Sequence, residues 1–520
     1  MLLHYDTFWS YLVEEDEFVF SKVQNLLTKS EYDFVTKNTN VITLFIEELD
    51  FLGRKQLKFP SGLVKYIKIN VPFIEVIPIQ TKLELKYTID EVLDICNQIK
   101  LINSSFEIRD YQAEAVLVSA NRFASLIEAS TGAGKTNIMG ILCRLLKDDK
   151  ILILNNQNFI LQQIYERLIS LGISQDEIGT GCTNLDRRIQ ICSTQTMFNR
   201  IQKNIPEVLD YLYNDVNTII TDECQHLQSI TGFLPILYTN PNNLRHIVGY
   251  SGSPFRNPKY PYNNLMDIVT IGILGEPAFK YSLSEAIEDT NIAQTYSYFI
   301  NYQPKKCYLP EYASYNSLYS FNIMKNENRN RAGIELIKFL NKHNIKTLVL
   351  FSKIDKHGLV VQKQLYDEGI KSLFLCGGET IYEFTGKKKP EKRKGNIDDI
   401  KKALNSDYNI ILGSSVFYEG IDISTLDVGI LFGGGKSPIS LTQANGRVAR
   451  KKQHDLNASI IVDFKDIGGH YIFQNQYEKR RQILRSNGVK NFDKVQDFMD
   501  MIIKIEESKN RFQNSKKEEN

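Results

Sequence analysis

Apolar residues between about 106 and 300 form short runs that alternate with amphipathic stretches. The runs are rich in Ile and Leu, which is typical of strands buried on both faces of a sheet. The stretch at 159–168 instead repeats its apolar residues every three to four positions, as an amphipathic helix does. Strands that alternate with helices predict a parallel sheet covered by helices on both faces. The apolar runs lie at 125–127, 151–154, 189–192 and 218–220.

The same alternation restarts after a stretch rich in Tyr, Asn and Pro. A helical pattern at 332–342 is followed by strand-like runs at 347–351 and 409–413. We therefore predict the α/β fold class, with two parallel-sheet domains in tandem. The predicted boundaries are 106–300 for the first domain, 301–327 for a linker and 328–490 for the second domain.

The two ends of the chain follow other patterns. Residues 1–105 mix short strand-like runs with a helical pattern at 89–99 and contain no nucleotide motif. They predict a small, separate α+β accessory domain, which we expect to bind DNA. We assign residues 491–520 to a polar C-terminal tail and expect its last part, from Glu506 to the final S-K-K-E-E-N, to be frayed.

Composition indicates where the protein works more than what it does. The chain has 520 residues and a net charge of +2, so affinity for nucleic acid must come from local patches. Its seven cysteines form no C-x-x-C pair, which favours reduced thiols in the cytoplasm, that of a host cell if the source is viral. No run approaches 18 apolar residues and the first residues lack a basic segment, so we expect neither export nor a membrane partner. Frequent Asn, Ile, Lys and Tyr are typical of an AT-rich genome and compatible with a phage.

The clearest chemical motif is A-S-T-G-A-G-K-T at 129–136. It matches the phosphate-binding loop pattern and stands between an apolar run and a helical stretch, which disfavours a chance glycine-rich turn. In such a loop, backbone N–H groups surround phosphates, the lysine adds positive charge and the hydroxyl after it binds Mg²⁺. We predict that ATP and Mg²⁺ bind here. The predicted nucleotide ligands are Ser130, Thr131, Gly132, Ala133, Gly134, Lys135 and Thr136, the last also for the metal.

Asp222 and Glu223 follow the apolar run at 218–220. Functional groups gather at the carboxyl ends of parallel strands, which would place this pair beside the phosphate loop. Asp222 is then a candidate Mg²⁺ ligand, and Glu223 a candidate to orient or deprotonate the attacking water. Without the loop, a solvated acidic pair would be the better interpretation.

A third motif, Q-A-N-G-R-V-A-R at 443–450, brings positive charge. Arg447 and Arg450 are three positions apart and share one face of a helix. A planar, permanently charged guanidinium group suits the oxygens of a transferring phosphoryl group. Two such arginines alone indicate only a solvated helix face, but Gln443 and Gly446 complete a longer signature.

In order along the chain, these segments resemble the motifs of superfamily 2 helicases. The R-D-Y-Q segment at 109–112 is similar to the glutamine element that reads adenine, and S-G-S-P at 251–254 is similar to motif III, which couples ATP state to nucleic acid. The segment at 413–422 resembles motif V, and that at 443–450 resembles motif VI. The resemblance implies nucleotide contacts from Arg109, Gln112, Gly420 and Asp422, catalytic roles for Lys135, Asp222, Glu223, Gln443, Arg447 and Arg450, and coupling through Ser251 and Ser253.

Within that superfamily the chain most resembles the UvsW-type phage recombination and repair helicases, relatives of branch-migrating and XPB-like enzymes. The segments at 59–64, 273–280 and 435–437 carry this narrower likeness. It implies two RecA-like domains, ATP hydrolysis between them, a monomeric protein and remodelling of branched DNA such as forks, D-loops and junctions. One departure is that Gln225, and not His, follows Asp222-Glu223-Cys224. Its amide can donate and accept hydrogen bonds, and we interpret His226 as a loop histidine.

The resemblance also implies contacts with DNA from Gln157, Thr194, Gln195 and Ser415. Small polar groups at strand ends hold phosphates without reading bases, although ordinary polar loops look the same in sequence. The basic run at 387–394, which begins with Lys387 and Lys388, predicts an exposed loop that either contacts the DNA backbone or is simply solvated.

Two other functions remain open. One is a motor of a restriction or transcription complex that moves on duplex DNA without unwinding it. The other is a non-hydrolysing module that binds or anneals DNA, which the complete set of ATP motifs disfavours. The sequence does not separate DNA from RNA.

Overall fold

The computed structural model divides into two compact units, one of residues 1–129 and 133–281 and one of residues 130–132 and 282–520. No helix among the described residues has the length and apolar character needed to cross a membrane. The residues that the structure describes are 2–5, 9–33, 38–78, 86–130, 132–225, 243–257, 261–304, 313–376, 380–395, 397–405, 408–414, 425–434, 452 and 456–518.

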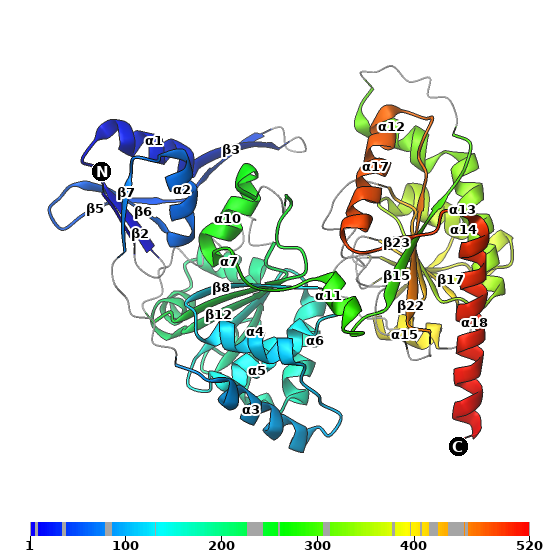
Figure 1. The fold of residues 1–520 in the computed structure, drawn as a ribbon, viewed down its shortest axis with the longest axis horizontal. Coiled ribbons are helices and arrows are strands. Elements are labelled where there is room, and N and C mark those ends of the chain that lie inside the picture. Colours follow the sequence, from blue (N-terminus) through cyan, green and yellow to red (C-terminus); the bar gives the residue numbers. More distant parts are fainter. Residues whose placement is uncertain are drawn as a thin grey trace. The chain divides into compact units, whose positions relative to one another are not determined.

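The chain begins with a small α+β domain, as predicted. A five-stranded sheet in the order β5-β6-β2-β1-β7 carries helices α1 and α2 (Figure 1). Leu3, Leu12 and Leu57 come from three neighbouring strands and are fully buried. The bounds are β1 Leu2–Tyr5, β2 Trp9–Val13, α1 Glu17–Leu27, β5 Ile46–Leu49, β6 Lys55–Pro60, η1 Ser61–Leu63, α2 Val64–Asn70 and β7 Glu75–Pro78, with a separate hairpin of β3 Thr28–Asp33 and β4 Asn38–Thr43.

The rest of the first unit is built on a seven-stranded parallel sheet in the order β10-β11-β9-β12-β13-β8-β14. Its central strands are buried along their whole length, which explains their unbroken apolar runs. Helices α4 and α5 cover one face and α10 the other, so the predicted three-layer arrangement is confirmed (Figure 1). The strands are β8 Ala124–Ala129, β9 Ile151–Asn155, β10 Ile178–Thr180, β11 Ile189–Ser193, β12 Thr218–Asp222, β13 His246–Ser251 and β14 Pro277–Tyr281. The main helices are α3 Ile89–Ile102, α4 Asp110–Ala120, α5 Lys135–Leu145, α6 Asn158–Ser170, α7 Thr194–Gln202, α8 Pro206–Asp210 and α10 Leu265–Leu274.

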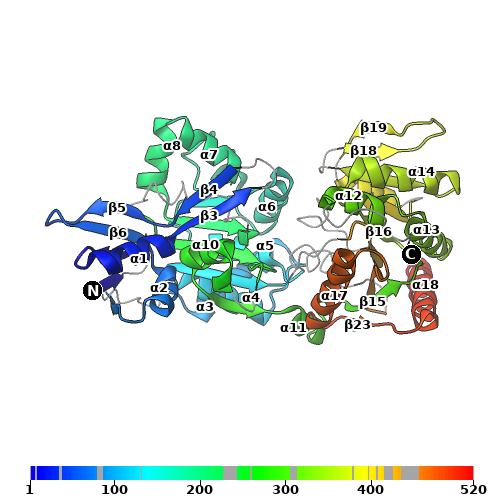
Figure 2. The same ribbon diagram turned by 90° about the horizontal axis from the view of Figure 1, so that it is seen from above.

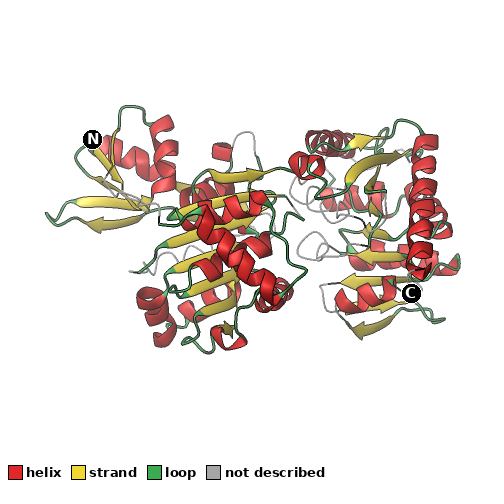
Figure 3. Cartoon of the chain, turned by 60° about the horizontal axis from the view of Figure 1, so that its bottom comes forward, coloured by secondary structure: helices red, strands yellow, loops and turns green. Residues whose placement is uncertain are grey.

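The second unit contains a nine-stranded sheet in the order β19-β18-β17-β20-β16-β21-β22-β15-β23. Helices again cover both faces, α13, α14 and α18 on one and α12 and α17 on the other (Figure 1). Figure 3 distinguishes these helices by colour from the strands that they cover. The strands are β15 Gln294–Ile300, β16 Thr347–Leu350, β17 Ser372–Cys376, β18 Thr380–Glu383, β19 Glu391–Lys394, β20 Ile410–Gly413, β21 Val428–Leu431, β22 Ala458–Phe464 and β23 Lys490–Asn491. The helices include α11 Leu283–Glu288, α12 Tyr315–Tyr319, α13 Glu327–Lys342, α14 Leu359–Asp367, α15 Ile397–Leu404, α17 Tyr471–Ser486 and α18 Val495–Glu518.

Two predicted boundaries in this unit are wrong. Strand β15 pairs in parallel with β22, so residues 294–300 belong to the second sheet and not to the first domain. The expected polar tail, frayed from Glu506, is instead the long helix α18, which continues to Glu518 and in which Phe498, Ile502 and Ile505 are buried. These three side chains recur every three to four positions and lie in the core of the second unit, which fixes the helix in place.

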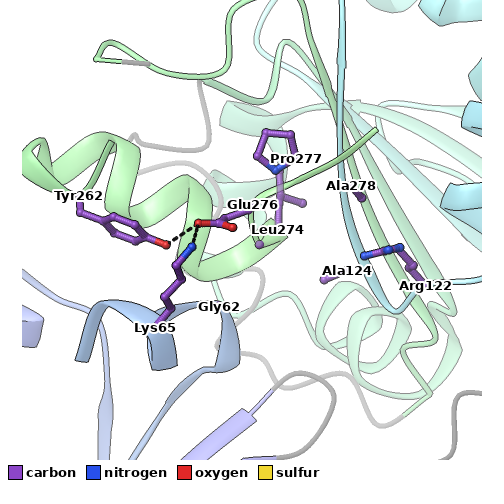
Figure 4. A pocket seen from close by; sticks show the side chains of 10 residues that line it. Gly62, Lys65, Arg122, Ala124, Tyr262, Leu274, Glu276, Pro277 and Ala278 are labelled. Atoms are coloured by element: carbon purple, nitrogen blue, oxygen red, sulfur yellow. Dashed lines mark hydrogen bonds and ion pairs between the residues drawn. The ribbon is translucent and has the colours of Figure 1, made fainter. Parts of the chain in front are cut away.

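The accessory domain is locked to the first parallel-sheet domain through η1 and α10. A Cβ atom on Gly62 would lie 2.0 Å from the Ile271 carbonyl oxygen, so only glycine permits this approach of the two backbones. Beside it, Lys65 forms an ion pair with Glu276, and the Tyr262 hydroxyl donates to the same carboxylate at 2.9 Å (Figure 4). The segments at 59–64 and 273–280, both singled out in the sequence, therefore meet at this joint.

Candidate ATP-binding site

The phosphate loop connects β8 to α5, as its pattern predicts. Gly134 caps the helix with φ +78°, and Gly132 has φ +92°, backbone conformations that glycine adopts without strain. The first N–H groups of α5 lack carbonyl partners within the helix and carry its positive dipole end, so they suit a phosphate. Lys135 Nζ lies 3.5 Å from the Ala129 carbonyl oxygen, at the start of the loop. Ser130, Ala133 and Thr136 are also described, whereas Thr131 lies outside the described residues.

Gln112 forms a hydrogen bond with the backbone of the phosphate loop. Its Nε2 donates to the Ala133 carbonyl oxygen at 2.8 Å, and its Oε1 accepts from the Arg109 backbone N–H at 3.2 Å. The Tyr111 hydroxyl donates to the same Ala133 oxygen at 2.8 Å and accepts from the Arg109 guanidinium group at 3.0 Å. Gln112 is 2% exposed, so in this structure its amide positions the phosphate loop. The role predicted for it, reading adenine, stays a prediction.

The acidic pair lies at the carboxyl end of β12, two strands away from β8. The strand register aligns Asp222 with Tyr250 of β13, and Tyr250 with Ile127 of β8. Neighbouring strands are about 4.8 Å apart, so the Asp222 backbone lies about 10 Å from the strand that enters the phosphate loop. Asp222 and Glu223 are 8% and 6% exposed, so the alternative of a solvated pair is wrong.

The electrostatics of Cys224 show how closely these charges gather. Burial raises the pKa of the Cys224 thiol well above its ordinary value, and the Glu223 and Asp222 carboxylates raise it further. The Lys135 ammonium group acts on the same thiol in the opposite direction. The lysine of the phosphate loop and both acidic side chains therefore all act on the pKa of one buried thiol.

Glu223 adopts an unusual backbone conformation. Its φ is +51°, in the left-handed region that residues other than glycine seldom occupy. Such a conformation costs on the order of 1–3 kcal/mol and persists only where the surroundings enforce it. The turn re-aims the Glu223 side chain at the end of the strand.

A hydrogen-bonded chain links Glu223 to motif III. Gln225 Nε2 donates to Glu223 Oε2 at 2.9 Å, and the Ser251 hydroxyl donates to Gln225 Oε1 at 2.6 Å. The Ser251 hydroxyl in turn accepts from the Ser253 backbone N–H at 3.0 Å. The sequence singled out Gln225 only as a replacement for His. The hydrogen bond from Ser251 to Gln225 could not be predicted from the sequence, because Ser251 comes 26 residues later and on another strand.

Asn155 is a site residue that the sequence left without a role of its own. Its Nδ2 donates to the Asp222 carbonyl oxygen at 3.3 Å, and its Oδ1 accepts from the Gln157 backbone N–H at 2.8 Å. It therefore ties the acidic strand end to the loop that begins α6. Gln157, predicted to contact DNA, follows directly on this connection.

The other predicted DNA contacts differ in their exposure. Gln195 is exposed near the start of α7, whereas Thr194 is only 6% exposed. Lys387 and Lys388 are exposed in the turn between β18 and β19, and Lys387 forms an ion pair with Glu391 at 2.6 Å. Half of the expected basic loop is instead the edge strand β19, all of whose side chains are exposed.

Several predicted residues of the second unit lie outside the described residues. They are Ser415, Gly420, Asp422, Gln443, Arg447 and Arg450, and His226 of the first unit shares this status. Their roles stay predictions.

Comparisons with known proteins find two family models that each match part of the chain. The family model described as "Type III restriction enzyme, res subunit" matches residues 105–256, and "Helicase conserved C-terminal domain" matches residues 330–452. "Putative helicase 22" of a Sulfolobus islandicus filamentous virus is 26% identical over 74% of this chain and 69% of its own length. The DNA 3'-5' translocase XPB2 of Sulfurisphaera tokodaii is 24% identical over 68% of this chain and 81% of its own length.

Solved structures share the fold. Dbp5 of Saccharomyces cerevisiae, bound to RNA and ADP BeF3, aligns with 81% of this chain and 98% of its own, at 13% identity and a TM-score of 0.53. T4 UvsW aligns with 94% of this chain and 98% of its own, at 19% identity and a TM-score of 0.40, a value too low to decide between helicase families. The first comparison confirms the predicted RecA-like, parallel-sheet architecture.

Proposed function

Because the chain belongs to the ATP-dependent helicases of superfamily 2, we propose that it is a DNA helicase of the UvsW type. It remodels branched DNA, such as forks, D-loops and junctions, in recombination, repair or replication of a phage. The chain acts as a monomer in the host cytoplasm. The viral relative is named as a helicase, and the archaeal relative, named as a DNA 3'-5' translocase, supports DNA as the substrate.

The residues of the first unit would divide the ATP chemistry among them. Backbone N–H groups of the phosphate loop hold the phosphates, and Lys135 balances their charge. Mg²⁺, held by Thr136 and Asp222, would neutralise the charge that develops on the transferring phosphoryl group. Glu223, turned by its left-handed backbone, orients the attacking water. Gln443, Arg447 and Arg450 would supply the further catalytic groups that the resemblance to superfamily 2 helicases implies.

The observation that carries this proposal is the chain of hydrogen bonds from Glu223 through Gln225 to Ser251 and Ser253. A simple ATPase needs only the phosphate loop and an acid. A motor also needs a path by which the nucleotide state changes the grip on DNA, and motif III lies at the end of this chain. The side chains of Gln157, Gln195, Ser415, Lys387 and Lys388, with Thr194, would then hold the DNA backbone.

A second candidate is a translocase that moves on duplex DNA without separating its strands. The match of residues 105–256 to a restriction-enzyme subunit favours this possibility. Both candidates share the ATP site described above and differ in the product they release.

Strand-displacement assays separate the two. The full chain is given ATP with forked DNA, a D-loop, a four-way junction or an RNA duplex, and in parallel a duplex that carries a bound third strand. The proposal predicts separated or migrated DNA branches, and none with Lys135→Ala. Displacement of the third strand from an otherwise intact duplex, with no branch remodelling, would support the translocase instead.

A further inference from the structure

The β5–β6 hairpin exposes apolar side chains at its tip. Phe51 is 92% exposed and Leu52 63% exposed, and Leu49 beside them is 67% exposed. Figure 2 shows this hairpin projecting from the rest of the first unit. Single exposed apolar residues are common, but three together at a projecting tip call for a partner.

The turn that carries them is held in one conformation by Asp50. Asp50 Oδ1 accepts from the backbone N–H groups of Leu52 and Arg54, at 2.9 and 2.8 Å. Its Oδ2 accepts from the Arg54 guanidinium group at 2.9 Å, and Gly53 supplies the φ of +76° that the turn requires. Because the backbone is fixed, Phe51 meets a partner without a further entropic cost of ordering the loop.

The hairpin is also attached firmly to the ATP-binding unit. Strand β6 ends at Pro60 and leads directly into η1, where Gly62 packs against the backbone of α10. Helix α10 packs in turn against β8, the strand that enters the phosphate loop. Packed elements therefore join the tip to β8, the strand that precedes the phosphate loop.

We propose that the Phe51–Leu52 tip stacks on an unpaired base where the strands of a DNA branch separate. Phe and Leu are side chains that insert between base steps, and every base offers a flat face for stacking. Asp50 balances the charge of Arg54, but Lys55, exposed directly after it, adds positive charge for a neighbouring phosphate. A protein partner fits less well, because stable interfaces bury about 800 Å² on each side, far more than three side chains offer.

The first test measures affinity of the full chain for forked DNA and for blunt duplex, without ATP. Phe51→Ser is compared with Phe18→Ser, a matched control on α1 whose Phe is 72% exposed and lies outside the tip. We expect Phe51→Ser to weaken binding to the fork about tenfold, the size of one lost base stack, and to leave blunt-duplex binding unchanged. Phe18→Ser should leave both affinities unchanged, and both variants should melt as the unmodified chain does.

The second test reports stacking directly. The chain has a single tryptophan, Trp9, which is 9% exposed, so Phe51→Trp adds one exposed fluorophore against a constant background. Forked DNA should quench the added emission, blunt duplex should not, and Phe51→Trp should bind the fork as tightly as the unmodified chain.

The proposal rests on the helicase function, and hydrolysis of ATP is therefore measured on the same samples. If DNA fails to stimulate the unmodified chain, the helicase function itself is wrong. If DNA stimulates it normally but Phe51→Ser binds forks with full affinity, only the role of the tip is overturned. The same conclusion follows if forked DNA leaves the added emission of the Phe51→Trp variant unchanged.

Discussion

Replacement of Gln225 by Ala tests whether the hydrogen-bonded chain positions the catalytic acid. Gln225 is 5% exposed and holds Glu223 Oε2 at 2.9 Å and Ser251 Oγ at 2.6 Å. The substitution removes both contacts and leaves the phosphate loop untouched. A hydrogen bond to a charged group contributes about 1.5–3 kcal/mol. If that energy positions Glu223 for the attack on ATP, kcat falls about 10- to 150-fold, whereas KM for ATP changes little.

The assay is steady-state hydrolysis of ATP at saturating forked DNA, for Gln225→Ala, Ser251→Ala and the double variant. Because Gln225 and Ser251 belong to the same series of hydrogen bonds, the fall in kcat of the double variant should be smaller than the product of the two single falls. Gln225→His supplies a pH test, since imidazole titrates near pH ~6.5 and the amide does not. Its rate should change through that pH range while the rate of the unmodified chain stays level there. A rise in KM at constant kcat, or losses that multiply, would refute the reasoning.

Three further predictions concern binding and stability. Gly134→Ala should weaken ATP binding in a nucleotide-binding titration, because its Cβ would lie 2.4 Å from Gln112 Nε2 at a φ of +78°. Burial and the Arg329 charge lower the pKa of the buried His357 to about 3, so the unfolded state binds the extra proton below pH 6.5. Urea unfolding should therefore show a loss of at most about 2 kcal/mol between pH ~6.5 and ~5, which His357→Gln removes. Arg480→Met leaves the carboxylates of Asp463 and Asp466 buried beside it with less compensation, and should lower the free energy of unfolding by about 3–5 kcal/mol.

The buried strands could be predicted because burial on both faces leaves a direct mark on the sequence. β9 contains the unbroken apolar run Ile151–Leu154, β12 contains the pair Ile219 and Ile220, and the phosphate loop follows its strand as its pattern requires. The edge strand β19 shows the opposite case. Its four residues are all exposed and mostly basic, so no apolar alternation separates it from a loop.

Other features depend on contacts between distant parts of the chain. The spacing of Phe498, Ile502 and Ile505 in α18 is helical, but the charged residues around them made the segment look like a solvated tail. Strand β15 was assigned to the preceding domain, since a sequence does not show which sheet a strand joins.

In the candidate site, too, some features follow from local sequence and others from contacts between distant residues. Local pattern identified Lys135, Asp222 and Glu223. Their common effect on the pKa of the Cys224 thiol and the left-handed turn at Glu223 could be recognised only in the fold. The hydrogen bond from Gln112 to the Ala133 carbonyl group was not predicted, because the motif that contains Gln112 predicts a contact with adenine instead.

The most direct test of the account is the rate of ATP hydrolysis by the full chain with and without forked DNA. We expect DNA to stimulate the rate, and Lys135→Ala, Glu223→Gln and Arg447→Ala each to abolish that stimulation while the chain remains folded. The claim that ATP hydrolysis by these residues drives the protein along DNA would be contradicted by a rate that DNA does not change. Normal turnover by Arg447→Ala would contradict it equally.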